Sequence, residues 1–153
     1  MSTLTVVDRS NRVAERIGLW LSPLLLLAFR LWVPWQFFKA GLVKASDWQS
    51  TLWLFEEEYR VPLLPPALAA AAGTAGELVF PVLLAAGFAT RWSALGLSLV
   101  NVMAVVAYAH VLLADGYEAA LGQHWLWGTV LAVLFAFGPG RWSVDAWLAA
   151  RRR

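Results

Sequence analysis

The fold is decided by one long apolar stretch near the N-terminus, IGLWLSPLLLLAFRLWVPWQFF, which covers residues Ile17–Phe38. Its only strongly polar side chains are those of Ser22, Arg30 and Gln36. A helix of about 20 mainly apolar residues is long enough to cross the hydrocarbon core of a bilayer. We therefore predict that residues 17–38 form a membrane span, with Pro34 kinking its outer third.

The composition of the whole chain agrees with this prediction. Of 153 residues, 60% are hydrophobic and 14% are charged, and the mean hydropathy is +0.62. Soluble domains usually carry about 25% charged residues. The pI is 9.4, but the net charge is only +2, so nucleic-acid binding is not expected. The chain contains no cysteine and can form neither a disulfide nor a thiolate metal site of its own.

Three further stretches are apolar enough to cross a membrane, and they cover residues 66–89, 92–114 and 121–138. The first of them is rich in Ala and Gly at four-residue spacing, a pattern that lets transmembrane helices approach closely. The sequence thus predicts an all-α integral membrane four-helix bundle, which forms one membrane domain over residues 17–145.

The distribution of Lys and Arg predicts the orientation of this bundle. Arginines precede the first span, join the second to the third and follow the fourth, whereas the connections on the other side are richer in Asp and Glu. We expect residues 1–16 to be a cytoplasmic segment that is not removed, and residues 146–153 to be a basic cytoplasmic tail. The predicted location is the inner (cytoplasmic) membrane, with multiple spans and both termini in the cytoplasm.

The long outer loop between the first two spans is predicted to contain a short amphipathic helix on the membrane surface. Ser46 is a suitable N-cap, and Gln49 would complete a capping box. Trp48, Leu52 and Phe55 then fall on one helical face. The three prolines between Val61 and Pro66 would end the helix in an extended turn.

Three polar residues fall at membrane depth, where an unpaired charge is costly. Arg30, Glu77 and Asn101 each lie near the middle of a predicted span. We predict that they meet in one buried polar cluster in which Arg30 pairs with Glu77. This cluster is either a clasp that holds the helices together or a centre that carries protons or binds a ligand.

The two histidines also have two interpretations. His124 opens the fourth span at the outer interface, and His110 points away from Asn101 because the two are separated by two and a half helical turns. Either histidine could be structural or could contact a ligand. No third ligand for a metal is evident, so no metal site is predicted. The chain carries no phosphate-binding loop, nucleophile elbow or HExxH motif, and catalysis by this chain alone has little support.

The chain resembles the DoxX family of small four-helix membrane proteins over nearly everything after its first 15 or so residues. The resemblance depends on several short motifs, which are Arg30 with Phe37–Gly41 and Lys44, LFEEEYRVPLLPP at 54–66, AGELVFPVLL around Glu77, GFATR at 87–91, His124 with Trp127, and GPGRWSVD at 138–145. Arg30, Lys39, Glu77 and Arg91 match the family pattern, but the resemblance transfers no established catalytic role to them.

The resemblance implies a link to membrane redox systems, to oxidative stress of thiols and to quinones, because the family takes its name from subunits of an archaeal thiosulfate:quinone oxidoreductase. The leading hypothesis is therefore a membrane subunit of a quinone-linked redox assembly, with a redox enzyme or a second copy as its protein partner and quinone as its possible cofactor. Outer-side contacts to quinone would come from Lys39, Tyr108, His110 and His124. The alternatives are a non-catalytic membrane anchor for a partner protein and a carrier of small solutes or metal ions.

Overall fold

The computed structural model describes residues 3–152, and the part of the chain that it describes contains helices but no strand. Four helices are long and apolar enough to cross a membrane. They are α1 (Thr3–Ser46), α3 (Pro66–Ala86), α4 (Thr90–Ala107) and α6 (Glu118–Phe137). The prediction of an all-α protein with four candidate spans is confirmed.

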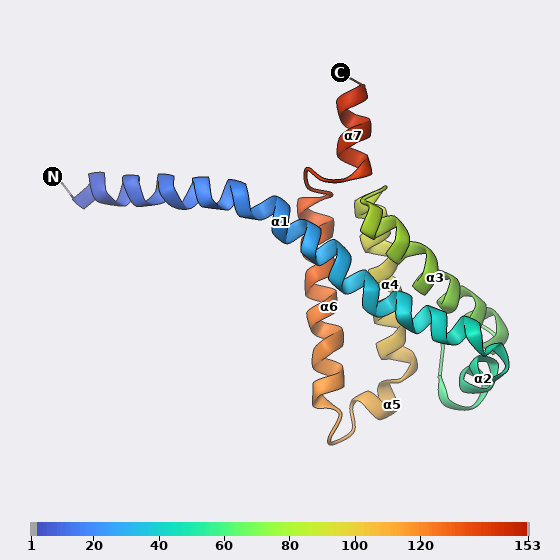
Figure 1. Cartoon of the computed structure of the whole chain (residues 1–153). Helices are drawn as coiled ribbons and strands as arrows, with labels where there is room; N and C mark the ends of the chain where they lie inside the picture. The colour runs from blue at the N-terminus through green and yellow to red at the C-terminus, as the bar shows by residue number, and fades with distance from the viewer. Residues whose placement is uncertain (1–2, 153) are drawn as a thin grey trace.

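The four long helices associate mainly as two pairs, α1 with α3 and α4 with α6, and α3 joins the pairs by packing against α4 (Figure 1). A continuous core of buried Val, Phe and Leu side chains lies where the pairs meet. Val33, Leu84, Leu97, Leu131 and Leu134 are fully buried there, and each long helix contributes at least one of them. Their burial holds the two pairs together at one end of the bundle.

The first helix is longer than predicted and enters the bundle later in the sequence. It runs from Thr3 to Ser46 without a break, although Pro23 and Pro34 lie inside it. Its N-terminal part extends away from the other helices as an arm, and the part after the arm crosses the bundle beside α3 (Figure 1). The predicted end at Phe38 was wrong because nothing in the following residues stops a helix before Asp47.

The third predicted span also ends elsewhere, because α4 stops at Ala107 rather than at residue 114. The backbone of Tyr108 leaves the helical conformation, and the carbonyl of Ala107 accepts a hydrogen bond of 2.9 Å from the amide of Arg60. A short helix, α5 (Ala109–Leu112), follows. The loop between the first two spans is thereby attached to the end of α4.

That loop contains α2 (Trp48–Trp53) and the π-helical turn η1 (Leu54–Glu58). The N-cap is Asp47 rather than Ser46, since the Asp47 carboxylate accepts bonds from the amide and the hydroxyl of Ser50 at 3.1 and 2.6 Å. Phe55 turns inward and packs against Ala69 and Ala70. The position of this loop helix on a membrane surface stays a prediction.

The last described helix, α7 (Val144–Arg151), covers most of the segment expected to be a basic tail. It lies at the same end of the bundle as the N-terminal arm, while α2 and α5 lie at the opposite end (Figure 1). This arrangement agrees with an even number of spans between the two ends. Which side of the membrane holds the two ends stays a prediction.

Candidate functional site

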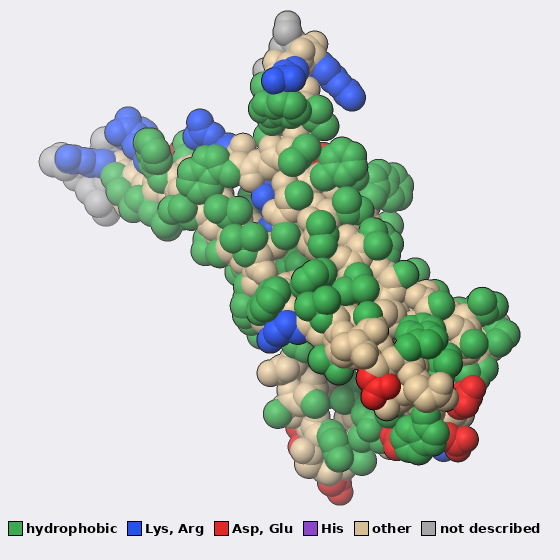
Figure 2. Space-filling view, turned by 45° about the vertical axis from the view of Figure 1, so that its right-hand side comes forward, with side chains coloured by type: hydrophobic (Ala, Val, Ile, Leu, Met, Phe, Trp, Pro, Cys, Tyr) green, Lys and Arg blue, Asp and Glu red, His purple; other side chains and the backbone are tan. Residues whose placement is uncertain are grey.

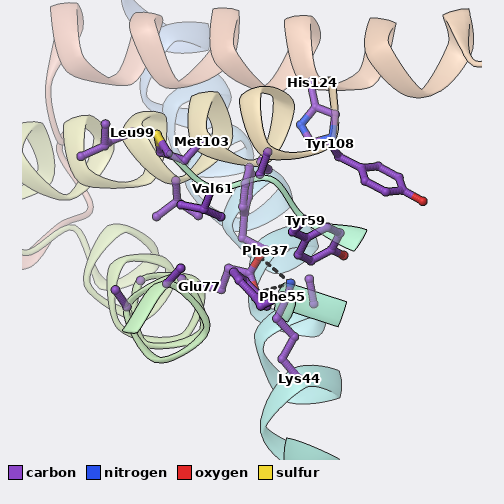
Figure 3. Close-up of a pocket in the computed structure, with 18 of the residues that line it drawn as sticks. Phe37, Lys44, Phe55, Tyr59, Val61, Glu77, Leu99, Met103, Tyr108 and His124 are labelled. Atoms are coloured by element: carbon purple, nitrogen blue, oxygen red, sulfur yellow. Dashed lines mark hydrogen bonds and ion pairs between the residues drawn. The ribbon is translucent and has the colours of Figure 1, made fainter. Parts of the chain in front are cut away.

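An apolar cavity of about 540 Å³ lies between the two helix pairs, toward the end of the bundle that carries α2 and α5. Each long helix contributes to its wall, and the loop residues after α2 cover part of it (Figure 3). Most of the lining is aliphatic or aromatic, and it includes Phe37, Phe55, Phe80, Leu99, Met103 and Trp127. A concave, mainly apolar space with a few polar groups is typical of a small-molecule site.

The polar wall of this cavity is an ion pair between α1 and α3. Lys44 donates to both carboxylate oxygens of Glu77, with Nζ–O distances of 2.8 and 2.7 Å. Their side chains are only 17% and 10% exposed. Figure 3 shows both groups beside the cavity, joined by the dashed lines. A carboxylate at this depth therefore keeps its charge compensated by a lysine from the neighbouring helix.

A glycine allows the two helices to approach closely enough for this pair to form. A Cβ atom added at Gly41 would lie 3.0 Å from the Cβ of Glu77 and 3.0 Å from Leu78. Lys44 follows Gly41 by about one helical turn, so its side chain lies over the same neighbour. The motif that runs from Phe37 to Lys44 thus places an apolar wall, a close helix contact and a cation in sequence along one face of α1.

A second polar contact lies on the α6 side of the cavity. The Asn101 side chain bonds to the ring Nδ1 of His124 at 2.8 Å and donates to the His124 carbonyl at 3.0 Å. Asn101 is buried, and His124 lines the cavity with its ring 5.0 Å from that of Trp127 in an edge-to-face arrangement. The asparagine fixes the orientation of the imidazole, which leaves Nε2 as the ring nitrogen free for another partner.

Aromatic side chains from the loop and from the end of α4 close the outer part of the cavity. Tyr59 packs edge to face between Phe55 and Tyr108, with ring centroids 4.9 and 5.3 Å away. The Tyr108 hydroxyl lies 3.5 Å from a carboxylate oxygen of Glu58. Burial raises the pKa of the Tyr59 phenol, and Tyr108 and the charges of Glu77 and Glu58 act in the same direction. Tyr59 therefore presents a neutral hydroxyl at physiological pH.

The predicted cluster of Arg30, Glu77 and Asn101 is not formed. All three residues are buried, but Glu77 pairs with Lys44 and Asn101 with His124. Because α1 and α3 are antiparallel and Gly41 lies opposite Glu77, Arg30 is displaced along α1 by about 16 Å from that level. The prediction was wrong because it ended the first span at Phe38, whereas the helix continues to Ser46 and brings Gly41 and Lys44 to the level of Glu77.

Arg30 instead joins α1 to the end of α3 and to the segment that follows α6, on the side of the termini. Its guanidinium donates to the carbonyls of Ala85 at 3.2 Å and Trp142 at 2.8 Å, and it also contacts the Pro139 carbonyl. With 2% exposure it is one of the most buried polar residues in the protein. Carbonyl groups at the ends of helices have no partner within the helix and accept such bonds readily. Arg30 thus connects three parts of the bundle through backbone carbonyls, whereas the cluster with Glu77 and Asn101, for which a clasp was predicted, is not formed.

Asp145 completes this end of the bundle. Its carboxylate accepts bonds of 2.8 Å from the amide of Ala89 and from the amide and hydroxyl of Thr90. Partial burial would raise the pKa of Asp145, but these hydrogen bonds and the charge of Arg30 together hold it below its ordinary value. Gly87 has a φ of +70°, and a Cβ there would lie 2.5 Å from the Cβ of Ser143. The GFATR motif at 87–91 and the GPGRWSVD motif at 138–145 are therefore in direct contact.

Of the four residues predicted as outer-side ligand contacts, Tyr108 and His124 line the cavity. Lys39 and His110 do not, because both side chains are exposed, although the His110 ring packs 5.5 Å from that of Tyr108. Within residues 3–152 no three His, Asp or Glu side chains gather closely enough to hold a metal ion.

Sequence reasoning missed Lys44 and Tyr59 as parts of the site. Lys44 lies beyond Phe38, where the first span was predicted to end, and was therefore not among the predicted contacts at membrane depth. A signal for its role existed, because Arg30 and Lys44 are fourteen residues apart and thus fall on one face of any helix that includes both. Tyr59 had no such signal, since its position depends on the fold of the loop.

The comparisons with known proteins agree with this architecture. The DoxX family model matches residues 25–111 of the chain. A protein of Haemophilus influenzae described as uncharacterized is 32% identical over 127 residues, which cover 78% of this chain and 80% of that protein. No solved structure matches the chain. The family match covers more than half of the sequence and includes the cavity residues of α1, α3 and α4. The chain belongs to the DoxX family of membrane proteins.

Proposed function

We propose that the cavity binds the head group of a lipid-soluble quinone and that the protein is the membrane subunit of a redox assembly. The observation that carries this proposal is the Lys44–Glu77 ion pair in the wall of an otherwise apolar cavity. Binding sites for small molecules combine apolar walls with a few oriented polar groups, and they commonly have volumes of about 300–1,000 Å³. The cavity volume of about 540 Å³ falls inside this range.

A quinone suits the chemistry of this wall. Its flat ring is apolar on both faces and carries two carbonyl oxygens at opposite ends, which accept hydrogen bonds. Lys44 on α1 and the Tyr59 hydroxyl on the loop can donate to the quinone oxygens. The His124 ring on α6 donates its Nδ1–H to Asn101 and presents Nε2 as an acceptor for a hydroxyl of the quinol. Figure 3 shows Lys44 and His124 on opposite sides of the cavity. Phe37 and Trp127, whose rings pack 5.3 Å apart, supply an aromatic surface for the ring.

Reduction of the bound quinone would need an electron donor. Reduction of a quinone to a quinol takes up two electrons and two protons, one proton at each carbonyl oxygen. Lys44, Glu77 and His124 are groups of this chain that can donate or relay protons at the cavity wall. The electrons would come from a redox partner that docks on this subunit, which is why we propose a subunit rather than a self-sufficient enzyme.

The test is a direct measurement of quinone binding to the purified protein. The full chain in detergent is titrated with a short-chain quinone by calorimetry, and two variants of α4 are compared. Met103→Trp places a bulky ring in the cavity, whereas Val102→Trp adds the same ring at the next residue, whose side chain is 54% exposed and outside the cavity lining. We expect saturable binding to the wild type and to Val102→Trp, and a loss of at least tenfold in affinity for Met103→Trp.

The alternatives give different results in the same preparation. No saturable binding to the wild type, together with a protein partner that copurifies at constant stoichiometry, would replace the proposal by a non-catalytic anchor. Transport of a solute or metal ion into vesicles that contain this chain alone would replace it by a carrier. Equal quinone affinity of Met103→Trp and the wild type would show that quinone binds outside this cavity.

A further inference from the structure

The N-terminal arm of α1 is a helix whose two sides differ in chemistry. Four of its large apolar side chains recur with the spacing of one helical face and are strongly exposed, with values of 52% for Val13, 53% for Ile17, 78% for Trp20 and 51% for Leu24. Leu19 and Leu21 are also exposed, at 71% and 47%, and lie outside that face. At 100° per residue its five charged side chains fall on another part of the circumference. They are Asp8, Arg9, Arg12, Glu15 and Arg16, and all are exposed.

The arm lies beyond the ends of the other spans. Arg30 marks their level, because it donates to the carbonyl of Ala85 at the end of α3 and to carbonyls that follow the end of α6. Residues 8–24 precede Arg30 by two to six helical turns. They therefore occupy the interface of the membrane or the water outside it, and not the hydrocarbon core.

The direction of the arm decides between these two environments. It runs across the direction of α4 and α6 instead of continuing along it (Figure 1). Pro23, which lacks an amide hydrogen and so weakens the helix locally, lies inside α1 between the charged residues of the arm and Arg30. Figure 2 shows Lys and Arg side chains along the upper edge of the arm, on the side of α7, with some hydrophobic side chains between them, and hydrophobic side chains alone along its lower edge. The apolar side thus faces the level of the membrane, and the charged side faces away from it.

We propose that residues 8–24 form an in-plane helix that lies on the lipid surface on the side of both termini and that binds anionic head groups. The apolar face would enter the boundary between head groups and acyl chains, where Trp20 is well suited to sit. The arginines would reach lipid phosphates from the edges of that face, because long cationic side chains extend to the interface. Three arginines against Asp8 and Glu15 leave a net positive charge on this surface.

The chain contains no cysteine, so a spin label reacts only with a cysteine that is introduced for the test. Ile17→Cys on the apolar side and Glu15→Cys on the charged side are matched labels two residues apart. The full chain is reconstituted in vesicles of phosphatidylcholine and phosphatidylglycerol, and collisions of the label with oxygen and with a water-soluble nickel chelate are measured. We expect a severalfold higher oxygen-to-nickel ratio at position 17 than at position 15.

Other outcomes overturn the proposal. Equal nickel access at both positions would place the arm in water. Dipolar broadening at position 17 with exclusion of both reagents would show that a second copy of the chain covers the apolar face. Replacing phosphatidylglycerol by phosphatidylcholine should reduce the ratio at position 17, and an unchanged ratio would refute the role of anionic lipid. A folded bundle, checked by circular dichroism of each labelled variant, keeps these results independent of misfolding.

Discussion

Replacing Lys44 with methionine should destabilise the folded protein by about 3 kcal/mol, because it leaves the Glu77 carboxylate buried without its cation. Removing one partner of a buried ion pair costs about 3–5 kcal/mol when the remaining charge stays desolvated. The two side chains are 17% and 10% exposed, so some water can reach the carboxylate. This partial access is the reason to expect the lower end of the range.

Replacing Glu77, the other partner of the pair, with glutamine should destabilise the protein less than Lys44→Met. Glu77→Gln keeps an acceptor for the Lys44 ammonium, and Lys44 lies close enough to the end of α1 to extend its side chain toward the interface. The expected cost is about 1 kcal/mol, because the ammonium exchanges a contact with both oxygens of a carboxylate for a weaker hydrogen bond to a neutral amide oxygen. The double variant with methionine at both positions should be closer to the wild type than Lys44→Met is, since no buried charge is left.

Unfolding by sodium dodecyl sulfate in mixed micelles, followed by circular dichroism, measures these free energies. Lys39→Met is the matched control, because it removes an exposed lysine from the same helix and should change stability by less than about 0.5 kcal/mol. A cost below about 1 kcal/mol for Lys44→Met, or a double variant that is as unstable as Lys44→Met, would refute the argument that a buried charge dominates.

Three further predictions use the same unfolding measurement. Gly87→Ala should destabilise by about 2 kcal/mol or more, because the added Cβ would collide with the adjoining loop and φ is +70°, whereas Gly18→Ala, with nothing within 4 Å, should have a much smaller effect. The pKa of Asp145 is depressed in the folded protein, so the stability that its carboxylate contributes is complete above the ordinary pKa of Asp. This stability is lost as the pH falls below that value, so the free energy of unfolding should drop below about pH 4. Asp145→Asn should flatten this part of the pH profile. Asn101→Ala should cost about 1–3 kcal/mol by leaving an imidazole nitrogen without its partner, and an equal effect of Ser98→Ala, which removes only a bond to its own helix, would contradict this reason.

The number and approximate positions of the membrane spans followed from the sequence because hydrophobicity is summed over a long window. An error of a few residues at the end of a span does not change such a sum. The second and fourth spans were therefore predicted to within three residues at each end, as 66–89 and 121–138 against Pro66–Ala86 and Glu118–Phe137. The burial of Arg30, Glu77 and Asn101 also followed, since lipid disfavours them at this depth.

Which of these buried residues are partners was decided only by the tertiary structure. Hydropathy ended the first span at Phe38, but the helix continues to Ser46, and eight residues correspond to about 12 Å along the axis. A shift of that size moves a side chain out of reach of one neighbour and into reach of another, so Glu77 meets Lys44 and not Arg30. Register depends on close contacts such as the one at Gly41, which involve two helices at once and leave no pattern in either sequence segment alone.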